Sequence, residues 1–282
     1  MRALIWVAVI ALMPAAASGA TLATITDATT GGRLLTNTQS IPDAFASVDD
    51  MFGWRTVGTD SFPDGGADDT TNDISGGGIS ATDDTGVVGA QNLGDTVFGV
   101  VDLDNPDNPS GAASATWTID ISGATNIEVA LDAAAMGDFD NVNDAFSFTA
   151  SIDGGGAVTL FDFLPDQSAS LTYGFDNGTT ETLDDPLVEQ NSGLTLGNDL
   201  TENRTGLLDP LTFASAIAGT GSILTLTFLA ENDGGEEAFF FDDIVISGDL
   251  VEAVPLPASA LLLLGALAAF ARFRGSRRMV AV

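Results

Sequence analysis

The stretch that decides the fold reads Ala115-Thr116-Trp117-Thr118-Ile119-Asp120-Ile121. Its apolar residues occupy the odd positions and its polar residues the even positions. Because successive side chains of a β-strand point to opposite faces, this alternation predicts a strand with one buried and one solvated face. Ser122 and Gly123 then predict a turn, and the alternation resumes over residues 127–131 as a second strand.

The same pattern continues through the second half of the chain. Asp153 and Gly154 form a hairpin signal between two alternating segments. Residues 238–247 are apolar on both faces apart from Asp242 and Asp243, which predicts a central strand. Further strands are expected at residues 51–57, 146–152, 158–163 and 223–229. We therefore expect an all-β, antiparallel, jelly-roll-like β-sandwich, with helices only at the two ends of the chain.

The composition excludes several classes of chemistry. The 282 residues include 40 Asp and Glu and eight Lys and Arg, all eight being Arg, and there is no His and no Cys. Catalytic triads based on His, thiolate metal sites, disulfides and Lys Schiff bases are therefore impossible. A formal charge of −32 argues against a nucleic-acid partner, because phosphates would be repelled.

The first twenty residues predict a secretory signal peptide. Arg2 supplies the positive start, residues 4–13 form an apolar run, and small residues follow Pro14. This order favours cleavage by signal peptidase after Ala20, and a buried N-terminal helix is the weaker alternative.

The C-terminal end carries three features in order. The motif Val254, Pro255, Leu256, Pro257 and Ala258 leads into an uncharged stretch over residues 258–271, which begins with the same Ala258. Four Arg follow at 272, 274, 277 and 278. The apolar stretch predicts a hydrophobic helix in the inner membrane, and the arginines predict that its C-terminal end stays in the cytoplasm. The alternative is an ordinary C-terminal anchor, for which the stretch is short.

Residues 254–278 resemble the VPLPA variant of the PEP-CTERM sorting signal. The resemblance implies recognition by an exosortase, a membrane-embedded cysteine transpeptidase of exopolysaccharide-producing Gram-negative bacteria. It further implies cleavage near the proline-rich motif and release or transfer of the protein to the cell surface. The resemblance concerns sorting alone and says nothing about the rest of the chain.

Between these ends lies an acidic β domain at residues 21–253, with looser sequence over 21–112 and core strands over 113–250. Residues 279–282 form a short tail. The domain keeps all 40 acidic residues but only Arg33, Arg55 and Arg204, which gives a formal charge of −37. Either salt adaptation or divalent-cation binding would explain this charge.

The domain resembles extracellular jelly-roll modules of the galactose-binding-like or concanavalin-like kind. The resemblance depends on residues 144–148, 152–155 and 238–248, and it implies a structural calcium ion. Calcium takes six to eight oxygen ligands, which short loops rich in Asp and Asn supply. One candidate loop contains Asp102, Asp104, Asn105, Asp107 and Asn108. The other contains Asp138, Asp140, Asn141, Asn143 and Asp144, with Asp242 or Asp243 as an additional ligand. The alternative is that these residues are solvated turn residues.

Sugar binding would need exposed aromatic rings. Trp54 and Tyr173 are the candidates for a sugar platform, whereas Trp117 falls on the apolar register of its strand and is expected in the core. A carboxylate-based hydrolase or lyase is the less favoured alternative, for which Glu128, Glu189 and Glu231 are conceivable. We expect a secreted, non-enzymatic, calcium-stabilised surface or matrix protein associated with exopolysaccharide, or alternatively a lectin-like module.

Overall fold

The structure is a computed structural model. It describes residues 19–41, 50–60, 62, 86–88, 94–104, 108–140, 144–175, 178, 180–200, 211–234 and 237–251. In this part of the chain every regular element is a β-strand, and all strand pairs are antiparallel. The expected antiparallel all-β fold is confirmed. The expected signal helix and the sorting segment at 254–278 lie outside the described residues.

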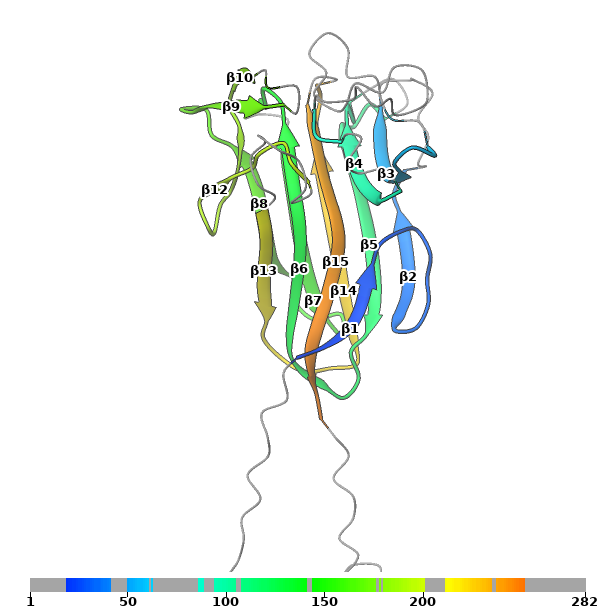
Figure 1. Ribbon diagram of the computed structural model, residues 1–282. Coiled ribbons are helices and arrows are strands. Elements are labelled where there is room, and N and C mark those ends of the chain that lie inside the picture. The colour runs from blue at the N-terminus through cyan, green and yellow to red at the C-terminus, as the bar shows by residue number, and fades with distance from the viewer. Residues whose placement is uncertain are drawn as a thin grey trace, which may run out of the picture. The chain divides into compact units, whose positions relative to one another are not determined.

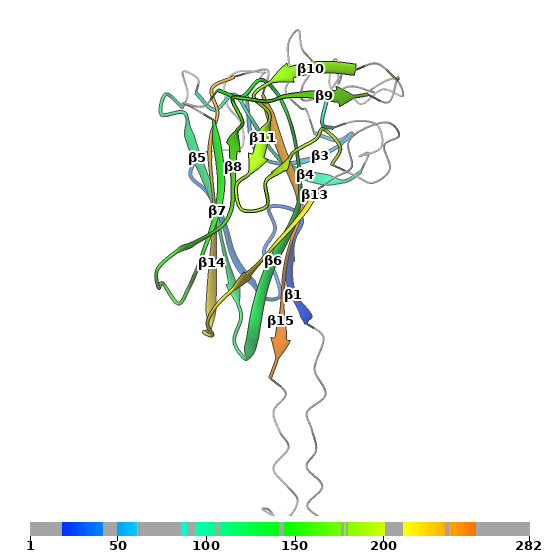
Figure 2. The ribbon, with the colours of Figure 1, turned by 90° about the vertical axis from the view of Figure 1, so that its left-hand side faces the viewer.

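Two sheets lie face to face (Figures 1 and 2). The six-stranded sheet has the order β13 (Leu211–Ile217), β6 (Ala124–Met136), β15 (Ala238–Leu250), β4 (Thr96–Val101) and β3 (Met51–Thr56). Its sixth strand, β1 (Ala20–Ile25), also pairs with β15. The seven-stranded sheet has the order β12 (Leu194–Thr195), β11 (Leu187–Glu189), β8 (Val158–Pro165), β7 (Ala145–Ile152), β14 (Ile223–Glu231), β5 (Ala112–Asp120) and β2 (Leu34–Gln39). A separate hairpin joins β9 (Ser170–Gly174) to β10 (Thr180–Asp184).

The strands follow the sequence pattern closely. In β5 buried and half-buried residues alternate without a break, as the alternation over residues 115–121 predicts. Asp153 and Gly154 both have positive φ, at 50° and 70°, in the loop between β7 and β8. Asp tolerates this left-handed conformation and Gly adopts it freely, which is why the pair marks the hairpin. The central position expected for residues 238–247 is confirmed, since β15 pairs with β6 on one side and with β4 and β1 on the other.

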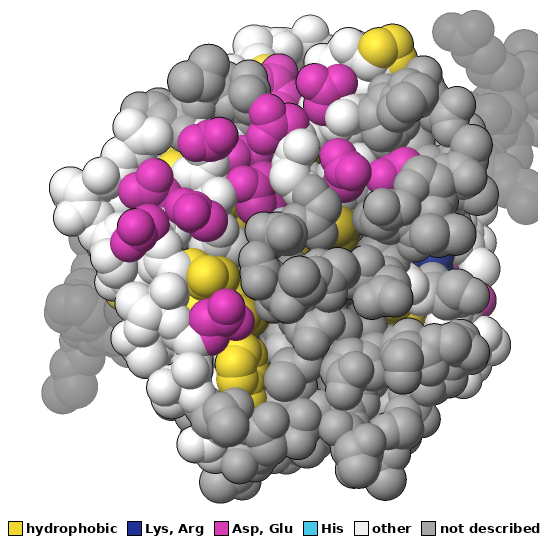
Figure 3. Space-filling view, turned by 90° about the horizontal axis from the view of Figure 1, so that it is seen from above, with side chains coloured by type: hydrophobic (Ala, Val, Ile, Leu, Met, Phe, Trp, Pro, Cys, Tyr) yellow, Lys and Arg dark blue, Asp and Glu magenta, His cyan; other side chains and the backbone are white. Residues whose placement is uncertain are grey.

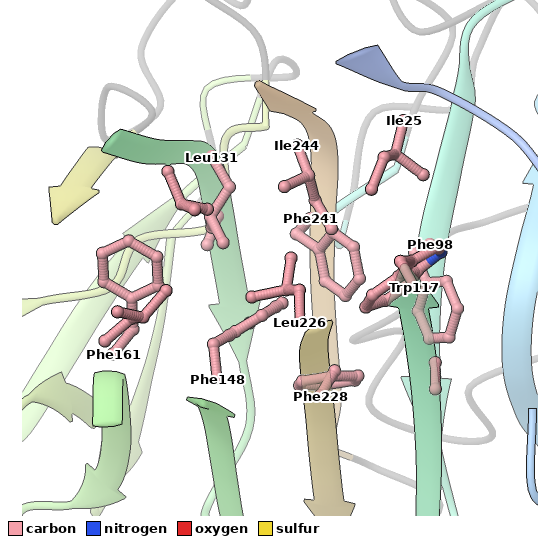
Figure 4. Close-up of a cluster of buried hydrophobic side chains, with 14 of the residues drawn as sticks. Ile25, Phe98, Trp117, Leu131, Phe148, Phe161, Leu226, Phe228, Phe241 and Ile244 are labelled. Atoms are coloured by element: carbon pink, nitrogen blue, oxygen red, sulfur yellow. The ribbon is translucent and has the colours of Figure 1, made fainter. Parts of the chain in front are cut away.

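The core between the sheets is rich in aromatic rings (Figure 4). Phe241 of β15 stacks on Phe98 with the ring centroids 4.7 Å apart, and it meets Phe148 and Phe228 of the opposite sheet edge-on at 5.2 Å. Trp117 is fully buried among them, as expected from its register. Strands β3 and β4 belong to the region expected to be looser, yet their Phe52 and Phe98 lie in this core.

A second apolar cluster covers the outer face of the six-stranded sheet at one end. Met51, Val101 and Phe240 of the sheet belong to this cluster, and so does Tyr173 of the β9–β10 hairpin. Segments 57–62 and 86–88 contribute further residues, namely Val57, Phe62, Val87 and Val88. This end of the six-stranded sheet is therefore buried on both faces.

The chain divides into two compact units, residues 1–250 and 251–282, and the sandwich belongs to the first. Strand β1 begins at Ala20, which pairs with Gly248 near the end of β15. Both ends of the sandwich chain consequently emerge at the same end of the sheets (Figure 1). In the described residues no helix is long and apolar enough to cross a bilayer.

Candidate metal centre

Three loops cross between the two sheets at the end opposite Ala20 and Leu250. They join β4 to β5 (residues 102–111), β6 to β7 (137–144) and β14 to β15 (232–237). Strand β14 lies between β5 and β7, and β15 lies between β4 and β6. The 232–237 loop must therefore run between the other two. Seen from this end, acidic side chains gather on the surface (Figure 3).

Three carboxylates meet where the loops adjoin. Asp144, Asp233 and Glu237 each place a carboxylate oxygen within 4.8 Å of the others. Asp144 is 2% exposed and Glu237 6% exposed, whereas Asp233 is half-buried. No other group of three or more such ligands occurs in the described part of the chain. Buried like charges at this separation repel, so the site needs protons or a cation.

Neutral donors hold the two buried carboxylates in place. The backbone N–H groups of Asp140 and Asp233 donate to the two oxygens of Asp144, the second at 3.3 Å. Glu237 Oε2 accepts from Asn232 Nδ2 at 3.0 Å and from the N–H of Gly234 at 3.1 Å. These bonds fix the positions of the carboxylates but supply no positive charge.

The pKa values reflect this uncompensated burial. Burial raises the pKa of Glu237 to about 9, and the charge of neighbouring Asp144 adds to the shift. Burial also raises the pKa of Asp144 to about 6, although backbone hydrogen bonds oppose the rise. Burial and the mutual repulsion of the two carboxylates therefore favour a proton held by the pair when no cation is bound.

Asn232 offers a further oxygen. Its side chain is 1% exposed, and within the described residues its Oδ1 has no hydrogen-bond partner. Its Nδ2 touches Glu237, so a half-turn of the amide would bring Oδ1 to the carboxylates. The backbone oxygen of Asn232 accepts from the N–H groups of Leu103 and Asp104 at 2.9 and 3.0 Å. These bonds tie the 102–111 loop to the centre.

The donor set suits calcium. All its side chains offer oxygen, and calcium accepts carboxylates, amide and backbone carbonyl oxygens and water in a flexible geometry. We define the cation site by Asp144, Asp233, Glu237 and Asn232. A bound divalent ion would neutralise the carboxylates and link the crossover loops of both sheets.

The second predicted calcium loop supplies one residue of the cation site. Asp144 belongs to it, whereas the Asp138 and Asp140 side chains are exposed and outside the group. Burial raises the pKa of Asp138, and the charges of Asp185 and Asp184 raise it further. Asn141 and Asn143 lie outside the described residues.

The first predicted calcium loop adjoins the cation site but gives it no described carboxylate. Asp102 and Asp104 are not in the group, and Asn105 and Asp107 lie outside the described residues. The Asn108 side chain stabilises its own loop, since its Nδ2 donates hydrogen bonds to the backbone oxygens of Leu103 and Ala112 at 2.9 and 3.3 Å.

Asp242 does not complete the site, which corrects the sequence-based expectation. It follows Phe240 on the outward register of β15 and pairs with Asp132 of β6 across the sheet. A bulge follows it, and burial raises its pKa to about 7. Asp243 lies in that bulge with φ 23° and is likewise outside the group.

Sequence reasoning missed Asp233, Glu237 and Asn232. Their signal was present in Asn232-Asp233-Gly234-Gly235-Glu236-Glu237, an acidic, glycine-rich loop directly before the closing strand. Nothing local distinguishes this loop from a solvated turn. Its importance comes from the sheet order, which places it between two other crossovers.

The proposed sugar platform is wrong in its main assumption, which was exposure. Trp54 is 6% exposed and Tyr173 is fully buried. The Trp54 ring packs edge-on against Phe98 and Phe241 in the core, while Tyr173 lies in the outer cluster. Both faces of the six-stranded sheet are covered at this end, so neither ring presents a face to solvent.

The three conceivable catalytic glutamates lie on different elements. Glu128 is exposed on β6, Glu231 is exposed at the end of β14, and Glu189 is buried at the end of β11. Glu189 accepts hydrogen bonds from the turn that follows it, including one from the N–H of Ser192 at 2.7 Å.

Comparison with known proteins gives distant structural neighbours only. No protein-family model matches the chain, and no curated protein matches its sequence. The structural neighbours include carbohydrate-binding modules with a β-sandwich fold. TmCBM61 in complex with β-1,4-galactotriose has a TM-score of 0.27 and 11% identity, covering 56% of this chain and 73% of its own.

Two further neighbours are similar in kind. The CBM22-1–GH10 modules of Clostridium thermocellum xylanase 10B, complexed with xylohexaose, have a TM-score of 0.24 and 8% identity, covering 58% of this chain and 23% of their own. The CBM2 module of the evolved Dit protein of Lactobacillus casei BL23 phage J-1 has a TM-score of 0.27 and 14% identity, covering 50% and 71%. At these low scores the similarity assigns no function to this chain.

Proposed function

We propose that this chain is an exported, non-enzymatic β-sandwich of the cell surface or extracellular matrix, stabilised by a structural calcium ion. One observation carries the proposal: Asp144, Asp233 and Glu237 bring three carboxylates within 4.8 Å of one another, two of them buried. Such a cluster destabilises the fold unless protons or a cation compensate it.

The cation would act as a link between the sheets. Asp144 directly precedes β7 of the seven-stranded sheet, and Glu237 directly precedes β15 of the six-stranded sheet. A ligand that binds the folded state alone stabilises it, by about 2.7 kcal/mol when its concentration is one hundred times its Kd. For a domain of this size we expect the Tm to rise by about 5–10 °C.

Thermal unfolding of the full chain, with calcium and with a chelator, tests this proposal. Asp144→Asn should abolish the calcium-dependent rise in Tm. Asp138→Asn is the matched control, since Asp138 is exposed in the same loop but outside the group, and it should keep the rise. An equal Tm with calcium and with chelator would refute the calcium site.

The export part of the proposal depends on the two ends of the chain. Residues 1–20 and 254–278 have the order expected of a signal peptide and a VPLPA-type sorting signal. Signal peptidase and an exosortase would be the processing partners. The C-terminal helix would anchor the chain in the inner membrane until it is cleaved. Mass spectrometry of the secreted protein tests this, because an intact C-terminus at Val282 would exclude processing.

Association with exopolysaccharide is a separate part of the proposal and depends on the sorting signal. Co-sedimentation of the secreted protein with the polysaccharide of its own culture tests it. A lectin-like role is the second candidate, and it now requires a surface other than Trp54 and Tyr173.

A further inference from the structure

A groove of about 450 Å³ lies between β13, the edge strand of the six-stranded sheet, and β8 of the seven-stranded sheet. Figure 2 shows both strands on the side of the sandwich that faces the viewer. Residues 212–215 of β13 and residues 159–161 of β8 line it from two sides, and the segment from the end of β11 to β12 completes the lining with Glu189, Asn191, Ser192 and Leu194. Side chains alternate between the two faces of a strand. A groove lined by consecutive residues therefore runs along the edges of these strands and not over their faces.

Both walls present strand edges that lack a partner strand in the described part of the chain. Strand β13 ends its sheet and pairs with β6 alone. Strand β8 pairs with β11 only at Phe163–Pro165, so residues 158–161 have a partner on one side only. Such edges carry rows of backbone N–H and C=O groups available to an added strand.

The residues of β13 itself include neither of the two side-chain features that commonly hinder strand addition, charge and proline. Its seven residues, Leu211–Ile217, contain no charged residue and no proline, although the chain has 40 acidic residues. Edge strands are normally kept from pairing by charges, prolines or bulges. β13 also pairs with β6 in one unbroken register.

The surroundings of this edge are negative. On the outer face of the sheet, Asp132 pairs with Thr212 and Glu128 pairs with Ala216, one strand inward from the edge. At the groove itself lies Glu189. Burial alone would raise the pKa of Glu189, but hydrogen bonds from Ser192 and Asn191 outweigh it and keep this pKa below its usual value. The groove therefore favours a basic partner.

The two aromatic rings that line the groove are buried and cannot stack on a sugar. Phe161 and Phe213 are 2% and 4% exposed, so neither presents a ring face on which a sugar could stack. A second copy of this chain would bring Glu128 and Asp132 of two bodies together, each body with a formal charge of −37. The unpaired strand edges, the negative surroundings and the buried rings therefore favour a basic peptide over a sugar or a second copy of this chain.

We propose that the groove binds an extended peptide segment that adds a strand to the edge of β13. Its apolar side chains lie toward Phe161 and Phe213, and its alternate, basic side chains lie on the outer face toward Asp132 and Glu128. In this mode of recognition the main chain supplies affinity and alternate side chains supply specificity. The proposal is independent of the cation site, which lies at one end of the sheets and not along this side.

Binding of a defined probe tests the proposal. The probe is a capped hexapeptide of alternating Arg and Val, titrated into the full chain in mild detergent and followed by fluorescence anisotropy. We expect saturable binding that weakens at least tenfold when the same residues are arranged as three Arg followed by three Val. Two further peptides carry backbone N-methyl groups on alternate residues: in one peptide on the Arg residues, and in the other on the Val residues. Only the set whose N–H groups face β13 should lose binding.

Variants of the protein locate the peptide. Ala214→Lys places a positive charge on the exposed face of β13 and should weaken binding at least tenfold. Thr36→Lys is the matched control on β2, an exposed position on the edge strand at the other end of the seven-stranded sheet, and should leave binding unchanged. Circular dichroism checks that both variants fold, and the N-methylated pair decides the question if Ala214→Lys does not fold.

Four results would overturn the proposal. The first is no binding of the alternating peptide. The second is an equal effect of both N-methylation patterns. The third is displacement of the probe by cellohexaose, which would make the groove a sugar site. The fourth is a dimer, seen by light scattering, that Ala214→Lys dissociates, which would make the occupant a second copy.

Discussion

Asp144 and Glu237 enter opposite sheets at the same end of the sandwich, and their carboxylate oxygens lie within 4.8 Å of each other. The two residues are 93 positions apart in the chain. Hydrogen bonds from Asn232 and from the N–H groups of Asp140, Asp233 and Gly234 hold them there. The closure of the sandwich at this end therefore depends on how their charge is compensated.

Replacing Glu237 by Gln should stabilise the protein in chelator and remove its response to calcium. The amide keeps an oxygen that can accept the hydrogen bonds of Asn232 and Gly234, but it carries no charge to repel Asp144. Isothermal titration calorimetry with calcium and thermal melts in chelator measure the two effects. Retention of calcium binding at wild-type affinity would remove Glu237 from the site.

Stability in chelator should fall as pH rises from about 4 to about 9. Burial raises the pKa of Asp144 from 3.8 to about 6 and that of Glu237 from 4.5 to about 9. Over this range the folded chain holds protons that the unfolded chain has released, so rising pH favours unfolding. Calcium binds the deprotonated carboxylates, and its stabilising effect should grow over the same range.

Melting temperatures across this pH range, with chelator and with calcium, measure both trends. The general repulsion among 40 acidic residues also grows with pH. The Glu237→Gln variant separates the two causes, because it should flatten the profile in chelator. A wild-type profile parallel to that of the variant would show that the pKa of Glu237 is not raised.

Gly99→Ala should destabilise the fold by about 1–3 kcal/mol through overpacking. A Cβ at Gly99 would overlap the Phe240 ring and lie 2.6 Å from the end of the Met51 side chain, both in the outer cluster. Gly156→Ala is the control, since no atom lies within 4 Å of a Cβ there. Urea unfolding compares them, and equal midpoints would show that the outer cluster tolerates the methyl group.

Phe241→Ala should cost about 3–5 kcal/mol, because it leaves a cavity in the core. Phe241 stacks on Phe98 and contacts Phe148 and Phe228 of the opposite sheet. Leu229→Ala is the matched surface substitution, since Leu229 is 44% exposed, and it should change stability by less than about 0.5 kcal/mol. Denaturant unfolding measures both free energies of unfolding. Similar decreases for the two variants would show that Phe241 does not lie at the centre of the core.

Much of the architecture could be predicted because strand periodicity is local. The alternation over residues 115–121 predicts which face of β5 is buried, and Asp153-Gly154 marks the hairpin between β7 and β8. Trp117 was placed correctly because its register alone determines its burial. Trp54 was not, since its exposure depends on which strands cover its sheet. Composition alone predicts the two acidic loops as calcium sites, but of the carboxylates in the cation site only Asp144 belongs to either loop.

The sequence by itself determined the antiparallel all-β class, through side-chain alternation, and it ruled out His, Cys and Lys chemistry by composition. The tertiary structure alone decided that Asp233 and Glu237 meet Asp144, and that the uncharged edge of β13 faces the edge of β8 across a groove. The physical reason is range. Alternation acts between neighbours in the chain, whereas these contacts depend on the order of strands in two sheets and on the path of the loops that cross between them.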